Sequence, residues 1–273
     1  MAGLGLGKTA ANSCFERGSY FLNLDHHNMK TFTGIFLVIC AWSGLSLKTI
    51  EKPKPFALVE LFTAEGCSSC PPADELLKEM TTLLHNEGKE VLGLSFHVTY
   101  WNKSGWEDPY SDEVYTERQK KYIEANHLEA LYTPQAVVNG AKEFVGSNPI
   151  AFRNEVTAAV EKAPLLAITA TARKDGQQVI IDYEASKVPE NQVINAAVVE
   201  TNITHFIPRG ENKSRTLHHY NVVRSFITAP LQAKGQLSIP FPKGLTGATG
   251  SLILYSQNAK SLKITGATQV AIN

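Results

Sequence analysis

A short apolar strand that leads directly into two cysteines is the feature that most constrains the fold. Residues 56–74 read FALVELFTAEGCSSCPPAD. The first part is apolar and is bounded by a proline and a glycine, which is typical of a buried strand. Pro71 and Pro72 then open a helical pattern that has acid in its first turn. Cys67 and Cys70 are therefore expected at a helix N-terminus, where the dipole and free N–H groups favour a thiolate.

Composition limits the classes of partner. The chain has 273 residues, 43% of them hydrophobic, so it can bury the core of one large domain or of two ordinary ones. Lys plus Arg and Asp plus Glu number 26 each, so no global field favours nucleic acid or an anionic membrane. Small molecules and proteins remain as partners.

The N-terminal region has the layout of a secretory signal. An apolar run at residues 31–47 follows Met29 and Lys30 and ends at a charged segment. The run is short for spanning a bilayer, so an uncleaved anchor is the second interpretation and a disordered extension the third. We expect residues 1–55 to be leader, signal peptide and linker, with Met29 as the true start. The mature protein would then be secreted or periplasmic, without a membrane span.

Residues 56–163 alternate between strand and helix patterns. Strands are expected at 57–62, 91–98, 136–138 and 143–145, the last two joined by an Asn139-Gly140 hairpin turn. Helices are expected after the cysteines, at 111–126 and at 149–162. The order β-α-β-α-β-β-α predicts a thioredoxin-like domain.

From residue 164 onward the helical patterns stop. About seven short strands, with Gly, Pro and Asn at the joints, predict a β-sandwich at 164–273. The predicted fold class is thus an α/β thioredoxin-like domain followed by an all-β sandwich-like domain. A polar segment at 210–224 enters one of the strands, and for its His218, His219 and Arg224 we expect a solvated or domain-contact role.

The spacing of Cys67 and Cys70 suits either redox chemistry or zinc. A structural zinc site needs four ligands and usually a second cysteine pair, which the sequence after residue 55 lacks. The redox interpretation is therefore favoured. In it, Cys67 is the exposed nucleophile and Cys70 the more buried resolving cysteine, and no cofactor beyond the dithiol is needed.

Other residues are candidates for supporting roles. Glu60 lies inside the apolar strand, where burial would suit it to shuttle the proton of Cys70, unless it faces outward at the strand's end. His97 ends the neighbouring strand and either reaches the sulfurs or makes a structural hydrogen bond. Trp101 and Trp106 either pack their aromatic loop or line a substrate groove.

The Thr133-Pro134 bond is expected to be cis. The proline opens the strand that leads into the hairpin, the place where thioredoxin-like enzymes hold a proline opposite their cysteines. A cis bend there would present the N–H and C=O of Thr133 to an extended substrate beside Cys67. Pro134 and Thr133 are therefore site candidates.

Several linked motifs resemble a family of uncharacterised secreted bacterial proteins with a thioredoxin-like domain. They are CSSCPPAD at 67–74, FHV at 96–98, YW at 100–101, GWEDPY at 105–110, YTPQAVVNG at 132–140 and FVG at 144–146. The resemblance implies the fold and export, but no substrate, since the family's activity is not established. Ser68 and Ser69 replace the Gly-Pro of thioredoxin, and a second proline follows Cys70, which leaves the direction of catalysis open.

Three functions follow. The first is an exported thiol-disulfide oxidoreductase that acts on a protein or a small thiol or disulfide. The second is a copper-binding or copper-delivery protein in which Cys67, Cys70 and His97 hold Cu(I). The third is a binding module with a static Cys67–Cys70 disulfide, whose sandwich carries the function.

Overall fold

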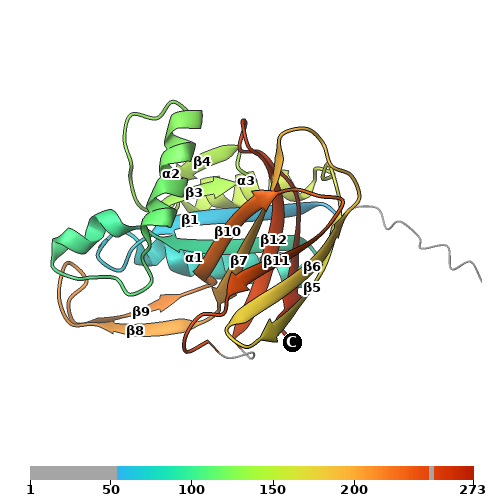
Figure 1. The fold of residues 1–273 in the computed structure, drawn as a ribbon. Helices are drawn as coiled ribbons and strands as arrows, with labels where there is room; N and C mark the ends of the chain where they lie inside the picture. Colours follow the sequence, from blue (N-terminus) through green and yellow to red (C-terminus); the bar gives the residue numbers. More distant parts are fainter. Residues whose placement is uncertain (1–53, 246–248) are drawn as a thin grey trace, which may run out of the picture. The chain divides into compact units, whose positions relative to one another are not determined.

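An eight-stranded mixed sheet forms the centre of the computed structural model, which describes residues 54–245 and 249–273 (Figure 1). The strand order is β13-β12-β7-β10-β2-β1-β3-β4. These strands are β1 (Phe56–Thr63), β2 (Glu90–His97), β3 (Gln135–Val138), β4 (Lys142–Val145), β7 (Gln192–Glu200), β10 (Val222–Pro230), β12 (Gly250–Asn258) and β13 (Ile264–Ala271). The signal sequence expected at residues 31–47 lies outside the described residues.

The N-terminal elements follow the predicted order. Helix α1 (Pro71–Asn86) connects the parallel strands β1 and β2, and the 3-10 helix η1 (Thr99–Ser104) and α2 (Glu113–Ala125) precede β3. Strands β3 and β4 form an antiparallel hairpin that is followed by α3 (Pro149–Val160). Asn139 and Gly140 both have positive φ, as a two-residue hairpin turn requires.

Strand β1 is buried on both faces because its side chains alternate between two cores. Ala57, Val59 and Leu61 pack with residues of α1 and α3. Leu58 and Phe62 pack on the opposite face with residues of α2, β2, β7 and β12. This double coverage explains why the strand reads as a continuous apolar run.

A smaller sheet covers part of the large one. Its order is β11-β6-β5, from β5 (Ile168–Asp175), β6 (Gln178–Ala185) and β11 (Lys234–Pro240). Ile181 of β6 shares a core with Val198 of β7 and Leu254 of β12, whereas the neighbours Val199 and Tyr255 face the other way. The period of two thus places one face of β7 and β12 against the small sheet and the other toward α2.

The predicted fold class, a thioredoxin-like domain followed by a sandwich-like domain, is wrong. Strand β10 pairs in parallel with β2 through Val222 and Ser95, and β7, β12 and β13 continue the same sheet. The Ser95 N–H donates to Asn221 O over 2.9 Å, and the Ser95 hydroxyl donates to Tyr220 O over 2.7 Å. One mixed sheet therefore runs across the two regions. A β-strand has two hydrogen-bonding edges, and its local sequence does not predict which strand pairs with each edge.

The sequence analysis also missed one hairpin. Strands β8 (Ile203–Ile207) and β9 (Arg215–His219) pair with each other as a separate two-stranded sheet. Most of their outward side chains are polar, although Phe206 is also exposed, and this pattern hid the strands. In the two described ranges, no helix combines the length and the apolar character needed to cross a bilayer.

Candidate active site at the Cys67–Cys70 disulfide

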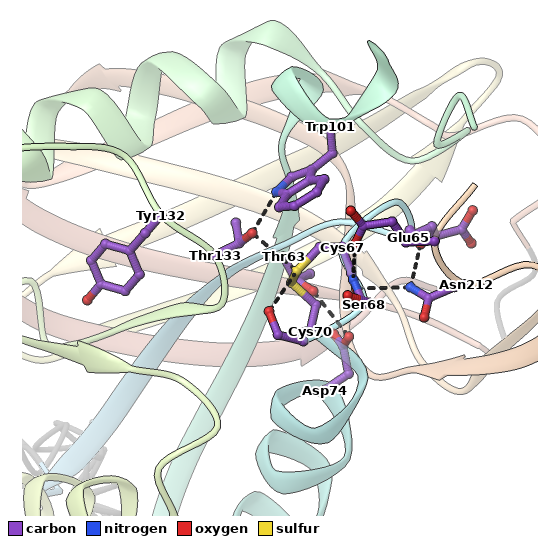
Figure 2. The surroundings of a disulfide bond; sticks show 12 residues. Thr63, Glu65, Cys67, Ser68, Cys70, Asp74, Trp101, Tyr132, Thr133 and Asn212 are labelled. Atoms are coloured by element: carbon purple, nitrogen blue, oxygen red, sulfur yellow. Dashed lines mark hydrogen bonds between the residues drawn. A yellow bond between two sulfur atoms is a disulfide. The ribbon is translucent and has the colours of Figure 1, made fainter. Parts of the chain in front are cut away.

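Cys67 and Cys70 form a disulfide at the junction of β1 and α1 (Figure 2). Their Cα atoms are 5.4 Å apart, within the range that a disulfide bridges without backbone movement. Cys70 is the N-cap of α1, and its carbonyl accepts from the N–H groups of Ala73 and Asp74. The proline at the start of the helix has no N–H to satisfy, so the sequence terminates the loop and begins the helix at this point.

Both cysteines are buried in this oxidised form. Cys67 and Cys70 are each 0% exposed, whereas Ser68 and Ser69 between them are exposed. The prediction of an exposed Cys67 is therefore wrong for the disulfide state, whereas Cys70 is buried, as expected. The Ser69 hydroxyl lies 3.4 Å from Cys67 Sγ, on the solvent side of the loop.

Two of the predicted residues, Thr133 and Trp101, form a hydrogen-bonded chain that ends at Cys67 Sγ. The Thr133 hydroxyl donates to this sulfur over 3.3 Å, and Trp101 Nε1 donates to Thr133 Oγ1 over 2.7 Å (Figure 2). The Trp101 bond occupies the oxygen of Thr133 as an acceptor and leaves its hydrogen for the sulfur. The Thr133-Pro134 peptide bond is cis, as predicted.

The loop that carries the cysteines is held by residues that the sequence analysis missed. Asn212 Nδ2 donates to the carbonyls of Glu65 and Cys67, at 2.8 and 2.9 Å. The Ser68 N–H donates to Glu211 Oε2 over 3.1 Å. Asn212 is buried although it lies between β8 and β9, more than 140 residues away in the sequence. Asn212 belongs to the polar segment at 210–224, which was the sequence feature that could have pointed to this contact.

Glu65 is the centre of a buried polar cluster next to the disulfide loop. Its carboxylate accepts from Trp106 Nε1 over 2.7 Å, and lies 2.7 Å from His205 Nδ1 and 3.3 Å from His219 Nε2. Burial raises the pKa of Glu65, but the hydrogen bonds from these three side chains outweigh it and leave the pKa lowered. Trp106 thus binds Glu65 through its indole N–H.

His97 pairs with a carboxylate and not with the cysteines. Its Nδ1 lies 2.7 Å from Asp108 Oδ2, and the same carboxylate accepts from the Glu65 N–H over 2.8 Å. Burial raises the pKa of Asp108, but the adjacent His97 ring and the hydrogen bonds lower it overall. Across residues 54–245 and 249–273, no group of three Cys, His, Asp or Glu side chains has the geometry of a metal site. The copper interpretation, which needs Cys67, Cys70 and His97 together, gains no support from this arrangement.

Asp74 and His219 complete the cluster under α1. Asp74 Oδ2 accepts from the Thr63 hydroxyl over 3.1 Å and lies 3.8 Å from His219 Nδ1. Burial lowers the pKa of His219, but the neighbouring carboxylates of Asp74 and Glu65 raise it to about 10. His219, for which we expected a solvated or domain-contact role, is therefore buried against two carboxylates that favour its protonated form.

Glu60 has other partners. Its carboxylate accepts from Arg118 Nε over 2.7 Å, from the Tyr255 hydroxyl over 2.8 Å and from the Tyr122 hydroxyl. Gln257 joins the same group through Arg118 and Tyr122. Glu60 is therefore buried and does not face outward, but among the described residues no hydrogen bond connects it to a cysteine.

The comparisons with known proteins place the chain in a family. A family model described as a protein of unknown function, DUF1223, matches residues 58–257. The chain belongs to this family. The match includes both cysteines and every residue of the Glu65 and Glu60 clusters, so the whole site lies within the family region. The resemblance seen in the sequence is confirmed to this extent, while the family itself carries no assigned activity.

Solved structures add one informative neighbour. A crystal structure of a protein from Agrobacterium tumefaciens has a TM-score of 0.56 and 27% identity, covering 80% of this chain and 94% of that one. A domain of the outer membrane lipoprotein Omp28 from Porphyromonas gingivalis is 10% identical, with 40% and 89% coverage, and its TM-score of 0.26 is too low to bear on the fold. Among curated proteins, none matches the chain.

Proposed function

We propose that this protein is a thiol-disulfide oxidoreductase whose reactive pair is Cys67 and Cys70. The observation that carries the proposal is the position of the disulfide. It lies at a helix N-terminus, with the Thr133 hydroxyl donating to Cys67 Sγ. A helix N-terminus and a hydrogen-bond donor both stabilise a negative charge on sulfur, and the thiolate is the form that exchanges disulfides.

A purely structural role is the alternative, and the short loop argues against it. The cysteines are three residues apart, so their cross-link removes little entropy from the unfolded chain. The loop-closure relation gives about 2 kcal/mol for such a loop, against about 4.7 kcal/mol for one of 100 residues. By contrast, Thr133, Trp101, Asn212 and Glu211 all hold this one loop.

The exchange has two balanced steps. A thiolate of a substrate dithiol attacks Cys67 Sγ, the Cys67–Cys70 bond breaks, and its electron pair leaves on Cys70 Sγ. The second substrate thiolate then attacks the substrate sulfur of the mixed disulfide and releases Cys67. The substrate dithiol is oxidised to a disulfide, and its two protons end on Cys67 and Cys70; the reverse sequence reduces a substrate disulfide.

Access to Cys67 requires a local opening. Neither sulfur is exposed in the oxidised form, and the exposed residues of the loop are Ser68 and Ser69. The opening therefore takes place in the segment that the Glu211 and Asn212 side chains hold. We further propose that the protein works after export, on the basis of the apolar run at residues 31–47.

A pair of single-cysteine variants tests the activity. We expect Cys70→Ser to accumulate mixed disulfides with partners or with glutathione, since Cys67 can attack but nothing resolves the product. Cys67→Ser should accumulate far fewer. Non-reducing gels and mass spectrometry of the folded variants measure both. Equal trapping by the two variants, or trapping by neither, would contradict the proposal and favour a static disulfide.

Export has its own test. The protein expressed in a Gram-negative host should be recovered outside the cytoplasm and shortened at its N-terminus. Recovery of the full-length chain from the cytoplasm alone would contradict the compartment.

A further inference from the structure

When the disulfide breaks, the Cys70 thiolate needs a proton. When a thiolate attacks Cys67, the negative charge arrives on Cys70, which is 0% exposed. A charge at a site shielded from water is costly unless it is paired or neutralised. In the closed form no water contacts this sulfur, so a neighbouring buried side chain offers the direct route for the proton.

Asp74 is placed to exchange a proton with Cys70. It lies four residues further along α1, and its N–H donates to Cys70 O over 3.2 Å. Cys70 has helical dihedral angles, so the two side chains lie on the same face of the helix (Figure 2). Asp74 is only 2% exposed, and its Oδ1 has no hydrogen-bond partner in the structure. The carboxylate thus keeps an unpartnered oxygen in a buried position, one helical turn along α1 from Cys70.

His219 supplies the proton to Asp74. Its Nδ1 lies 3.8 Å from Asp74 Oδ2, is buried, and has no hydrogen-bond partner. Its Nε2 faces Glu65 at 3.3 Å, which orients the ring so that Nδ1 points toward Asp74. The two carboxylates raise the pKa of His219 to about 10, so the ring carries two protons at neutral pH.

The cluster reaches the surface through His205. Glu65 Oε1 is shared by His219 and by His205 Nδ1, and the His205 side chain is 31% exposed. A proton lost from His219 can therefore be replaced from solvent without any exposure of the disulfide.

We propose that Asp74 and His219 form a proton relay for the Cys67–Cys70 pair, which passes a proton to Cys70 when the disulfide breaks and removes it when the disulfide forms. The inference rests on the proposed function. Asp74 exchanges the proton with sulfur, and His219 acts through Asp74. The relay connects α1, which carries Asp74, to β9, which carries His219. The β8–β9 hairpin, for which the sequence analysis predicted no strands, thereby takes part in the proposed chemistry.

The test measures the rate at which dithiothreitol reduces the disulfide, between pH 6 and pH 10. Free thiols are quenched by alkylation and counted by mass spectrometry. The probe's own ionisation is the same for all variants, so the ratio of variant rate to wild-type rate reports the relay alone. The variants are Asp74→Asn and His219→Gln, with His218→Gln as the matched control because its side chain is exposed on the same strand.

We expect both relay variants to react at least tenfold more slowly at pH 7, since general acid catalysis commonly contributes about 10² to 10⁴. The wild-type advantage over His219→Gln should shrink as the pH rises through about 10, where His219 loses its proton. The ionisable groups that face His219 are Asp74 from α1, Glu65 after β1, His97 from β2, and Tyr110 before α2. Because Glu65, Asp74 and His97 stay in place in this variant, a lost pH dependence is assigned to His219.

The outcomes separate the relay from the proposed function. Wild-type rates in both variants at every pH would overturn the relay, as would a loss that is the same at every pH, which indicates a structural role. Absence of mixed disulfides in the Cys70→Ser variant would overturn the proposed function instead. His205→Gln, at the partly exposed end, should give a two- to fivefold loss, and this variant still decides the matter if the buried variants fail to fold.

Discussion

In the described part of the chain, the buried charged side chains around Glu60 and those around Glu65 differ in how completely their polar atoms are paired. In the Glu60 cluster, the carboxylate meets Arg118 and two tyrosine hydroxyls, and Gln257 closes the group. None of the buried unpartnered side-chain atoms found in the described residues belongs to it. All three, namely Asp74 Oδ1, His97 Nε2 and His219 Nδ1, belong to the cluster around Glu65.

This difference in pairing suits the Glu60 cluster to a structural role and the Glu65 cluster to proton transfer. A fully satisfied network fixes the packing of β1 against α2 and β12 and has no free site for a proton. An incompletely paired cluster costs free energy, and a role in catalysis is one explanation for keeping buried polar atoms unpaired. The open cluster is also the one that touches the disulfide loop, through the Asn212 bonds to Glu65 and Cys67.

The largest expected effect is the loss of the Glu60 charge. Glu60→Gln leaves Arg118 as an unpaired buried cation, so we expect the free energy of unfolding to fall by about 3 to 5 kcal/mol. Urea unfolding followed by circular dichroism measures it. The double variant Glu60→Gln with Arg118→Met should cost less than the sum of the two single changes. A loss below 1 kcal/mol for Glu60→Gln would show that this cluster is not the structural one.

The His219→Gln variant tests the Glu65 cluster through the pH dependence of the free energy of unfolding. The folded-state pKa of His219, about 10, is above its unfolded value of 6.5, so its stabilisation is full below pH 6.5 and is lost as pH rises through about 10. Wild-type stability should therefore fall with pH more steeply than that of His219→Gln, by at most about 1.4 kcal/mol per pH unit. Urea midpoints at pH 6, 7, 8 and 9 measure the two slopes. Parallel slopes would mean that His219 is not held as a cation.

Opening the disulfide should have a smaller effect. The double variant Cys67→Ser with Cys70→Ser should lower the free energy of unfolding by about 2 kcal/mol or less, because the loop is short. Thermal or urea unfolding of this variant and of the oxidised protein gives the value. A loss of 4 kcal/mol or more would indicate that the cross-link is structural.

The smallest effect is expected at His218. Its side chain is exposed and contacts Thr204 across the β8–β9 hairpin. His218→Gln should change the free energy of unfolding by less than about 0.5 kcal/mol and leave its pH slope unchanged. A change like that of His219→Gln would show that the hairpin, rather than the buried ring, accounts for the effect.

The local elements and the closely spaced cysteine pair can be read from the sequence alone. Each of these features depends on only a few neighbouring residues, so a single sequence is enough to predict it. They are the apolar run of β1, the prolines that begin α1 and the Asn139-Gly140 turn. Cys67, Thr133 and Trp101 could likewise be assigned to one site, since each lies at an end of an expected strand or in its following loop, and the structure brings them together.

Tertiary structure alone decided the rest. The pairing of β2 with β10 joins residues more than 120 positions apart. Both edges of a strand present the same backbone groups, so no single residue predicts which strand will pair with it. The partners of the disulfide loop, Asn212 and His219, come from a hairpin whose polar pattern is typical of a surface. Their chemistry depends on burial and on the distance to a carboxylate, and both quantities exist only once the chain has folded.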